Sequence, residues 1–226
     1  SSLCDKKNKM TSLDETCQIE IVNDRCKVLR KGSDNTFEIL SPPLHVSFSR
    51  IGKTGTLGSR YAKNIEQAEY VITLECNKAV DASFSNRLKA IQELAIRTWW
   101  ASESSFPSSK SSFTTIDDIL LKAIPVITST NTIRIKRKVC EFGRTYSPLP
   151  IYTKKKEQNS FYKSNFRTCN SVNVKKGDLV RVVLTCHPYS ILNETKIGMS
   201  LRLHSIFKVK NDETSSCRRD WSSWSV

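Results

Sequence analysis

Residues 47–61, SFSRIGKTGTLGSRY, include the last three positions of a nucleotide-binding P-loop at 52–54. A complete P-loop has another glycine five positions earlier, so that backbone amides wrap round the phosphates while the lysine reaches the outer ones. Here that position holds Ser47, and Gly55 and Gly58 discourage the helix that must follow. The pattern does not favour an NTPase, so we interpret the segment as a basic, glycine-rich connector that closes on phosphates.

Side chains that hold metals or act as nucleophiles lack the spacing those roles require. None of the eight cysteines forms a C-x-x-C pair, and the adjacent Cys186 and His187 have no second pair at ligand spacing. Asp117 and Asp118 fall in the first turn of a short predicted helix, where acidic residues stabilise the helix dipole without a metal. We therefore expect reduced thiols, no metal, no cofactor and no catalytic site.

The charge of the chain points to a polyanionic partner. The 226 residues carry a formal net charge of +14. Residues 131–181 hold thirteen Lys and Arg against three acidic residues, which is most of that surplus. Nucleic acid is the first partner that such a concentration indicates, before an anionic membrane surface. No apolar run approaches the roughly 20 residues of a membrane span, and the polar start is no signal peptide, so we expect a protein that is neither secreted nor in a membrane.

The segment TIRIKRKV, residues 132–139, predicts a strand with one apolar and one cationic face. Ile133 and Ile135 alternate with Arg134, Lys136 and Lys138, and side chains alternate across a strand. A solvated strand face usually mixes both signs of charge, yet no acidic residue is interleaved here. This favours phosphate contact, and RIKRK is also a candidate nuclear import signal.

Residues 148–170, PLPIYTKKKEQNSFYKSNFRTCN, interleave aromatic residues with lysine and arginine. Cations follow a nucleic-acid backbone while ring faces stack unpaired bases, which is the combination a single-strand site requires. The alternative is that two or three of these rings pack in the core.

Short strands and one long helix must position these side chains. Turn residues at 23–24 and 32–34 divide residues 17–40 into strands. Two strands follow at 44–48 and 69–76, the first with Leu44, Val46 and Phe48 on its buried face. Apolar residues recur at helical spacing from Asp81 to Trp100, with Gln92 on the polar side. Trp99 and Trp100 then pack at the helix end or stack a base.

The second half of the chain continues in the same way. A short helix is expected at 116–124, ended by Pro125. A Gly-Asp turn enters a strand at 174–186, with Arg181 opposite its buried face, and Arg202 lies on the outer face of its partner at 198–209. The connection 187–197 is long enough for a functional loop.

Residues 172–209, VNVKKGDLVRVVLTCHPYSILNETKIGMSLRLHSIFKV, preceded by the basic strand NTIRIKRKV, resemble single-stranded DNA-binding proteins of large eukaryotic DNA viruses, of the asfarvirus and baculovirus type. The matching order is basic strand, long basic connector, Gly-Asp strand, loop and glycine-started strand. The resemblance implies an elaborated OB-like barrel. Mainly β structure with one long and one short helix, an α+β chain, suits that class independently.

We therefore expect a non-enzymatic, sequence-tolerant protein that coats and protects single strands in viral DNA replication or recombination, in the host nucleus or at a cytoplasmic replication site. Its partner is single-stranded DNA or RNA. The alternative is a basic structural protein that packages duplex DNA in a virion. The expected nucleic-acid contacts are Arg50, Lys53, Arg60, Tyr61, Arg134, Lys136, Lys138, Tyr152, Lys154, Lys155, Lys156, Phe161, Tyr162, Arg181 and Arg202.

The expected organisation is one OB-like domain at 17–210, with a mobile Ser-rich loop at 102–115. A flexible segment precedes it at 1–16, and a polar tail follows at 211–226. Trp221 and Trp224 in that tail are expected to contact a partner or a neighbouring protomer, because exposed tryptophans in flexible tails favour self-association.

Overall fold

A computed structural model describes residues 10–12, 16–51, 62–77, 79–102, 115–141, 144–145, 149–154, 163, 166–168, 173–191 and 196–209. The chain divides into two compact units, where the sequence predicted one domain over 17–210. The first unit comprises Ser1–Phe37, Asn86–Val126 and Cys186–Ser200, and the second comprises Glu38–Ser85, Ile127–Thr185 and Leu201–Val226.

The first unit contains a three-stranded antiparallel sheet in the order β1 (Met10–Ser12), β2 (Cys17–Val22) and β3 (Arg25–Arg30). Asn23 and Asp24 both adopt positive φ in the β2–β3 turn, as expected of residues that tolerate left-handed backbone. β1 belongs to the segment expected to be flexible, yet Met10 to Ser12 pair with Glu20 to Gln18.

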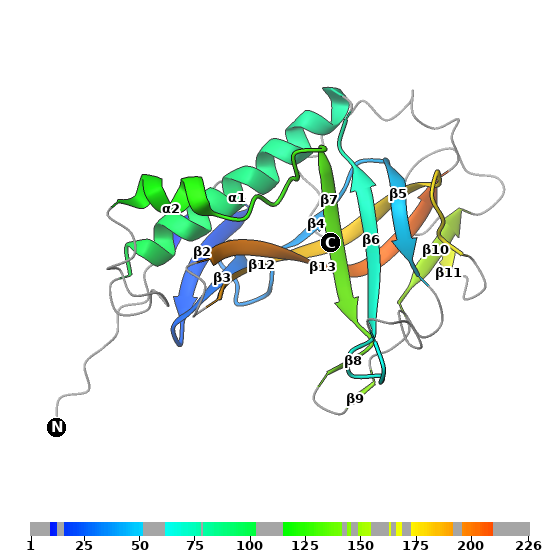
Figure 1. Cartoon of the computed structure of the whole chain (residues 1–226), viewed down its shortest axis with the longest axis horizontal. Helices are drawn as coiled ribbons and strands as arrows, with labels where there is room; N and C mark the ends of the chain where they lie inside the picture. Colours follow the sequence, from blue (N-terminus) through cyan, green and yellow to red (C-terminus); the bar gives the residue numbers. More distant parts are fainter. Residues whose placement is uncertain are drawn as a thin grey trace. The chain divides into compact units, whose positions relative to one another are not determined.

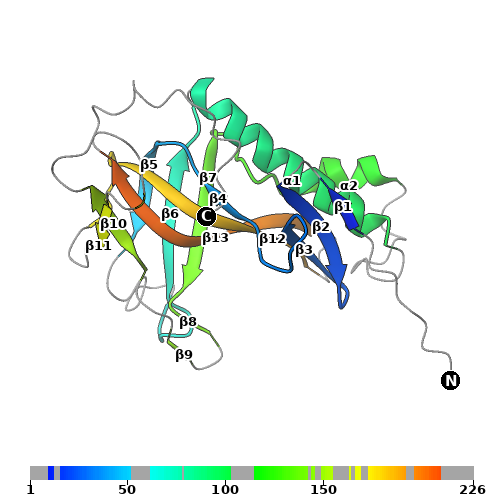
Figure 2. The same cartoon turned by 180° about the vertical axis from the view of Figure 1, so that it is seen from behind.

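Helix α1 (Ala82–Trp100) follows the short 3₁₀ turn η1 (Ala79–Asp81), and most of it packs on this sheet (Figures 1 and 2). The Cys26 thiol lies 3.6 Å from the Ala95 carbonyl oxygen, and the Arg87 guanidinium lies over the Phe37 ring. Its buried apolar residues recur at helical spacing: Phe84, Leu88, Ile91, Ala95, Ile96 and Trp99. The burial of Trp99 confirms that this side chain packs at the helix end.

Gln92 does not lie on the polar face of α1 as predicted. It is 8% exposed, its side-chain nitrogen donates to the Ile124 carbonyl, and its oxygen accepts from the Val126 amide. Helix α2 (Ile116–Lys122) precedes this segment. Asp118 accepts from the Thr115 amide in a capping box. This contact supports the prediction that Asp117 and Asp118 stabilise the first turn of a helix.

The second unit contains most of an eight-stranded sheet, in the order β11-β10-β13-β7-β6-β5-β12-β4. Its strands are β4 (Glu38–Leu40), β5 (Leu44–Arg50), β6 (Glu69–Glu75), β7 (Thr132–Lys138), β10 (Ile151–Lys154), β11 (Phe166–Thr168), β12 (Leu179–Ile191) and β13 (Lys196–Val209). β8 (Cys140–Glu141) pairs separately with β9 (Arg144–Thr145). The ends of β12 and β13 nearest their connection belong to the first unit.

β13 pairs with β12 as well as with β7. The order β13, β7, β6, β5 and β12 therefore returns to its starting strand. β13 runs parallel to β7, and β5 runs antiparallel to β6 and β12. Ile72, Leu74, Ile133 and Ile135 are fully buried on one face of this sheet, so the other face of β6 and β7 is the accessible one. The described chain is thus mainly β with two α-helices, as expected.

Three details differ from the sequence prediction. Phe48 is 42% exposed, because a β-bulge between Val46 and Phe48 shifts the pairing with β6 and turns the ring to the opposite face. Arg181 is 2% exposed, because β12 is buried on both faces from Leu179 to Cys186. The supposed loop 187–197 is mostly strand, since β12 extends to Ile191 and β13 begins at Lys196.

Within the described ranges Cys17, Cys26, Cys76, Cys140 and Cys186 form no disulfide. Burial raises the pKa of the Cys26 thiol to about 12 and that of Cys76 to about 11, which keeps both thiols protonated at neutral pH. No helix in the described part of the chain has the length and apolarity needed to cross a bilayer.

Candidate nucleic-acid interface

The accessible face of β5, β6, β7 and β13 brings cations together in cross-strand rows. Arg50 pairs with Val71, Val71 with Lys136, and Lys136 with Arg202. Paired residues point to the same side of a sheet, so Arg50 and Lys136 flank Val71 in this first row and Arg202 lies beyond Lys136.

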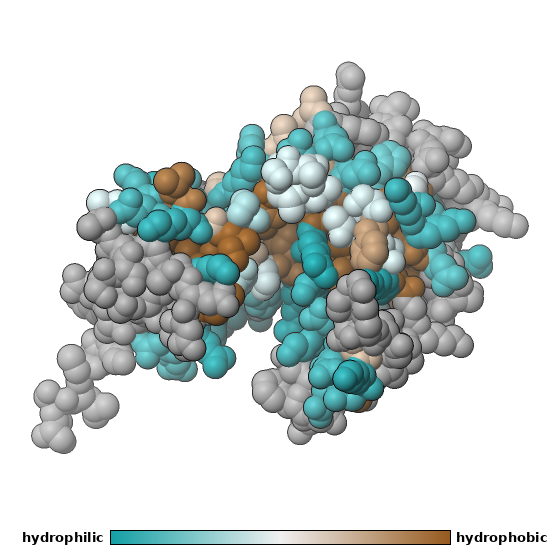
Figure 3. Space-filling view, viewed as in Figure 1, coloured by the Kyte–Doolittle hydropathy of each residue, from teal (hydrophilic) through white to brown (hydrophobic). Residues whose placement is uncertain are grey.

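Two further rows flank it. Thr73 pairs with Phe48 on one side and with Arg134 on the other, while Glu69 pairs with Lys138. Figure 3 shows hydrophilic side chains gathered over β7. We call this surface the cationic face, and it consists of Phe48, Arg50, Glu69, Val71, Thr73, Arg134, Lys136, Lys138 and Arg202.

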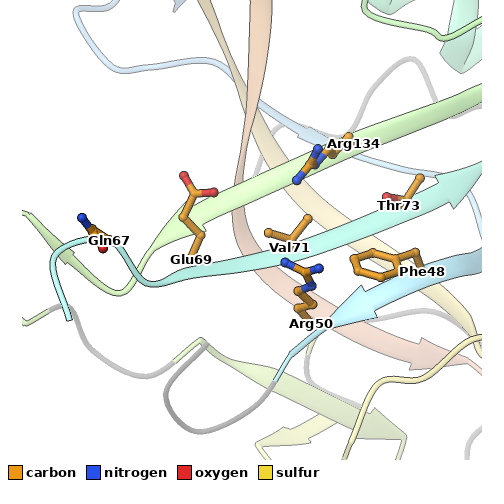
Figure 4. Close-up of a pocket in the computed structure, with 7 residues that line it drawn as sticks. All are labelled: Phe48, Arg50, Gln67, Glu69, Val71, Thr73 and Arg134. Carbon is orange, nitrogen blue, oxygen red and sulfur yellow. The ribbon is translucent and has the colours of Figure 1, made fainter. Parts of the chain in front are cut away.

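An open pocket of about 470 Å³ lies in the cationic face. Phe48, Arg50, Gln67, Glu69, Val71, Thr73 and Arg134 line it, and Figure 4 shows their side chains on three adjacent strands and the turn before β6. Val71 is 1% exposed and forms the floor. The Arg50 guanidinium carbon lies 5.2 Å from the centre of the Phe48 ring, so aromatic and cationic groups occupy the same part of the pocket.

Glu69 places an acid among these cations. Its Oε2 lies 3.3 Å from Lys136 Nζ, and both side chains are partly exposed. No acidic residue is interleaved within β7, as the sequence indicated, but the neighbouring strand β6 supplies Glu69 beside these cations and Glu75 further along the same face. The cationic face therefore has mixed charge with a positive surplus.

A tight turn holds β5 beside its bulge. Val46 donates its amide to the Asp178 carbonyl and accepts from the Gly177 amide, with Gly177 at a φ of 89°. Asp178 Oδ2 accepts from Lys208 Nζ and from the Lys175 amide, both at 2.9 Å. Burial opposes ionisation of Asp178, but these hydrogen bonds and the lysine charges outweigh it and lower its pKa.

A chain of polar contacts links β4, β12 and β13 beside the cationic face. His204 Nε2 lies 2.9 Å from Thr185 Oγ1, and His204 Nδ1 lies 3.8 Å from Glu38 Oε1. The order hydroxyl, imidazole and carboxylate is that of a catalytic triad, but Thr185 is 1% exposed and out of reach of a substrate. Arg137 on β7 donates to the His204 carbonyl at 3.3 Å, and burial lowers the pKa of that arginine. These contacts therefore hold β4, β7, β12 and β13 in position relative to one another.

The structure unites some of the predicted contacts and separates others. Arg50, Arg134, Lys136, Lys138 and Arg202 share the cationic face, whereas Arg181 is buried. Tyr152 is half-buried, and its ring stacks on the Phe207 ring with centroids 4.7 Å apart, so it belongs to the packing around Leu40 and Val183. Lys154 lies at the end of β10, which pairs with Ile206 to Lys208 of β13, beyond Arg202 along that strand.

The remaining expected contacts lie outside the described residues: Lys53, Arg60, Tyr61, Lys155, Lys156, Phe161, Tyr162, Trp221 and Trp224. So do the tail at 211–226 and most of the Ser-rich loop at 102–115.

Sequence reasoning missed Phe48, Glu69, Thr73 and Gln67. Phe48 and Arg50 stand two positions apart in a strand, the aromatic and cationic pattern that was used for residues 148–170. The same reasoning applied to this pair would have predicted Phe48 as a contact for a base. The candidate import signal RIKRK lies within β7, whose backbone is paired with β6 along its length, so the folded chain does not present it as an extended peptide.

Comparison with solved structures shows a similar fold. Gp2.5, a single-stranded DNA-binding protein encoded by bacteriophage T7, matches with a TM-score of 0.50 and 11% identity over 81% of this chain and 98% of that chain. The single-stranded DNA-binding protein of bacteriophage Enc34 in complex with ssDNA has a TM-score of 0.47 and 12% identity over 92% and 98% of the two chains.

No protein-family model matches the chain, and no curated protein matches its sequence significantly. Gp2.5 is a phage protein, so the resemblance to proteins of large eukaryotic viruses stays a prediction.

Proposed function

We propose that this protein is a non-enzymatic single-stranded DNA-binding protein and that the cationic face is its binding surface. The strand order β13-β7-β6-β5-β12, which returns to β13 through the pairing with β12, supports an OB-like barrel. The strand face and loops of such a barrel hold extended polynucleotides. On this assignment the bound single-stranded DNA lies across the accessible face of β6 and β7.

The observation that carries the proposal is the exposure of Phe48 among cations. A large apolar ring that is 42% exposed leaves much of its surface in water in the folded monomer, and it offers a platform for an unpaired base. Arg50, Arg134, Lys136, Lys138 and Arg202 can neutralise the phosphates on either side and release counterions. Duplex DNA keeps its bases inside, so stacking favours the single strand.

The similarity of the fold to that of gp2.5 from bacteriophage T7 supports single-stranded DNA binding as the function. We further propose that the protein coats and protects single strands in viral DNA replication or recombination. Packaging of duplex DNA would need the cations but not Phe48, which makes it the weaker candidate.

The experiment is a titration of fluorescein-labelled oligo-dT and of duplex DNA of equal length, followed by fluorescence anisotropy. Five phosphates neutralised on a single strand predict a loss of about a hundredfold in affinity between 50 and 200 mM salt. Duplex should bind at least about tenfold more weakly, the lower range of one lost stacking contact. Equal affinity for both forms, or binding that salt does not weaken, would contradict the proposal.

A further inference from the structure

The pocket of the cationic face has the length and the lining side chains to hold one base of the bound single-stranded DNA. Its volume of about 470 Å³ lies within the roughly 300–1,000 Å³ typical of ligand pockets. Phe48 is paired with Thr73, four residues beyond Glu69 on β6. At a rise of about 3.3 Å per residue, Phe48 and Glu69 therefore bound opposite ends of a space about 13 Å long over Val71. A base held over Val71 between these two residues lies in the pocket that the Glu69 side chain lines.

Glu69 is an unexpected group in a surface for phosphates. An ionised carboxylate repels phosphate and only accepts hydrogen bonds. A carboxylate offers about four acceptor positions and so can accept more than one hydrogen bond. The Glu69 side chain is 31% exposed and lines the pocket, as Figure 4 shows. The groups that it suits are the amino groups on base edges.

The two pyrimidines differ at that edge. Cytosine presents an amino donor at position 4, where thymine and uracil present a carbonyl acceptor. Glutamate accepts from the cytosine amino group, but its carboxylate meets the thymine or uracil oxygen with like charge. Arg50 and Arg134 only donate hydrogen bonds, so neither of them can accept from the cytosine amino group.

We propose, on the basis of the function proposed above, that this pocket holds one unstacked base and that Glu69 selects a base with an exocyclic amino group. The binding surface is then sequence-tolerant at most positions and selective at one. Glu69 is a specificity-determining residue, and its contact with Lys136 orients the carboxylate at the pocket wall.

The test compares oligodeoxycytidine with oligodeoxyuridine of equal length, because this pair varies the edge at positions 3 and 4 without the thymine methyl group. Affinities are measured by anisotropy competition above neutral pH for the wild type, Glu69→Gln and Glu75→Gln. Glu75 lies on the same strand and the same face but outside the pocket, so it is a matched control for loss of one negative charge. Loss of that charge tightens binding to both oligomers in either variant, so the ratio of affinities is the readout.

We expect the wild type and Glu75→Gln to prefer the cytidine oligomer by about fivefold, the lower range for a base-edge contact, and Glu69→Gln to lose that preference. Circular dichroism should show that all three proteins are folded alike. Equal wild-type affinity for both oligomers would overturn the role of Glu69 while leaving single-strand binding intact. A preference that persists in Glu69→Gln would overturn it as well. Failure of the wild type to bind either oligomer at low salt would remove the proposed function itself.

Discussion

The Arg50 guanidinium lies over the Phe48 ring, with 5.2 Å from its carbon atom to the ring centre. The two residues share a face because they stand two positions apart beyond the bulge in β5. A cation over one face of a ring restrains the ring and leaves the charge near the same surface. Stacking and phosphate contact can therefore act on one nucleotide.

Replacing Phe48 should weaken single-strand binding without loss of the fold. Phe48→Ala removes one stacking platform, which is worth about 1–3 kcal/mol per base, so we expect roughly tenfold weaker binding to oligo-dT. Anisotropy titration measures this change. Phe48→Trp keeps an aromatic face and should bind at least as well as the wild type, whereas duplex binding should be the same in all three proteins. Equal losses for single strand and duplex would show that the ring supports the fold instead.

Neutralising cations of the accessible face should reduce the salt dependence of binding. Arg134→Gln with Lys138→Gln removes two charges next to Thr73 and Glu69. Each phosphate contact contributes about −0.7 to the slope of log K against log salt for single strands, so the slope should become shallower by about 1.4. The control is Lys89→Gln with Lys122→Gln, two exposed lysines of the first unit. An equal change in this control would mean that total charge, and not this face, determines binding.

Strand and helix periodicity made much of the fold predictable. The alternation of Ile133 and Ile135 with Arg134 and Lys136 specified both faces of β7, because each isoleucine must leave water. The same rule failed for Phe48, since a bulge reverses the alternation and no residue type near Ser47 marks it. It also failed for Arg181, because strand β12 is covered on both faces and alternation then has no outer side.

The candidate site was less predictable than the fold, because its partners come from separate strands. The contact between Glu69 and Lys136 depends on the register of β6 against β7, which the separate sequences of the two strands do not contain. Arg50, Lys136 and Arg202 were each predicted singly. Their common row around Val71 follows only from the order of four strands.

Gln92 should contribute to stability through two backbone partners. In Gln92→Leu the Ile124 carbonyl and the Val126 amide lose their hydrogen bonds. Each unsatisfied buried group costs about 1–3 kcal/mol, so we expect a loss of about 2–6 kcal/mol in the free energy of unfolding. Urea unfolding measures it. The control is Glu93→Gln at the next, exposed position, which removes an ion pair with Arg97 worth less than about 0.5 kcal/mol. Similar midpoints for the two variants would show that water replaces both bonds of Gln92.

His204 should make stability depend on pH below neutrality. Burial lowers the pKa of His204, and the charges of Arg202 and Arg137 lower it further, against the opposing effect of Glu38. The folded state then binds fewer protons than the unfolded state, so stability rises with pH. The contribution is complete above the unfolded pKa of about 6.5 and is lost as pH falls below that value, by at most about 1.4 kcal/mol per pH unit.

Thermal or urea unfolding of the wild type and of His204→Gln between pH 7 and pH 5 tests this prediction. Glutamine at this position has no charge to gain, so the variant should lose less stability on acidification although it starts from a lower value at pH 7. His45→Gln, which alters a histidine on β5, should keep the wild-type dependence on pH. Because carboxylates titrate in all three proteins, the difference between the curves of wild type and His204→Gln is the measured quantity. Parallel curves would mean that protonated His204 is accommodated, with Glu38 compensating for its burial.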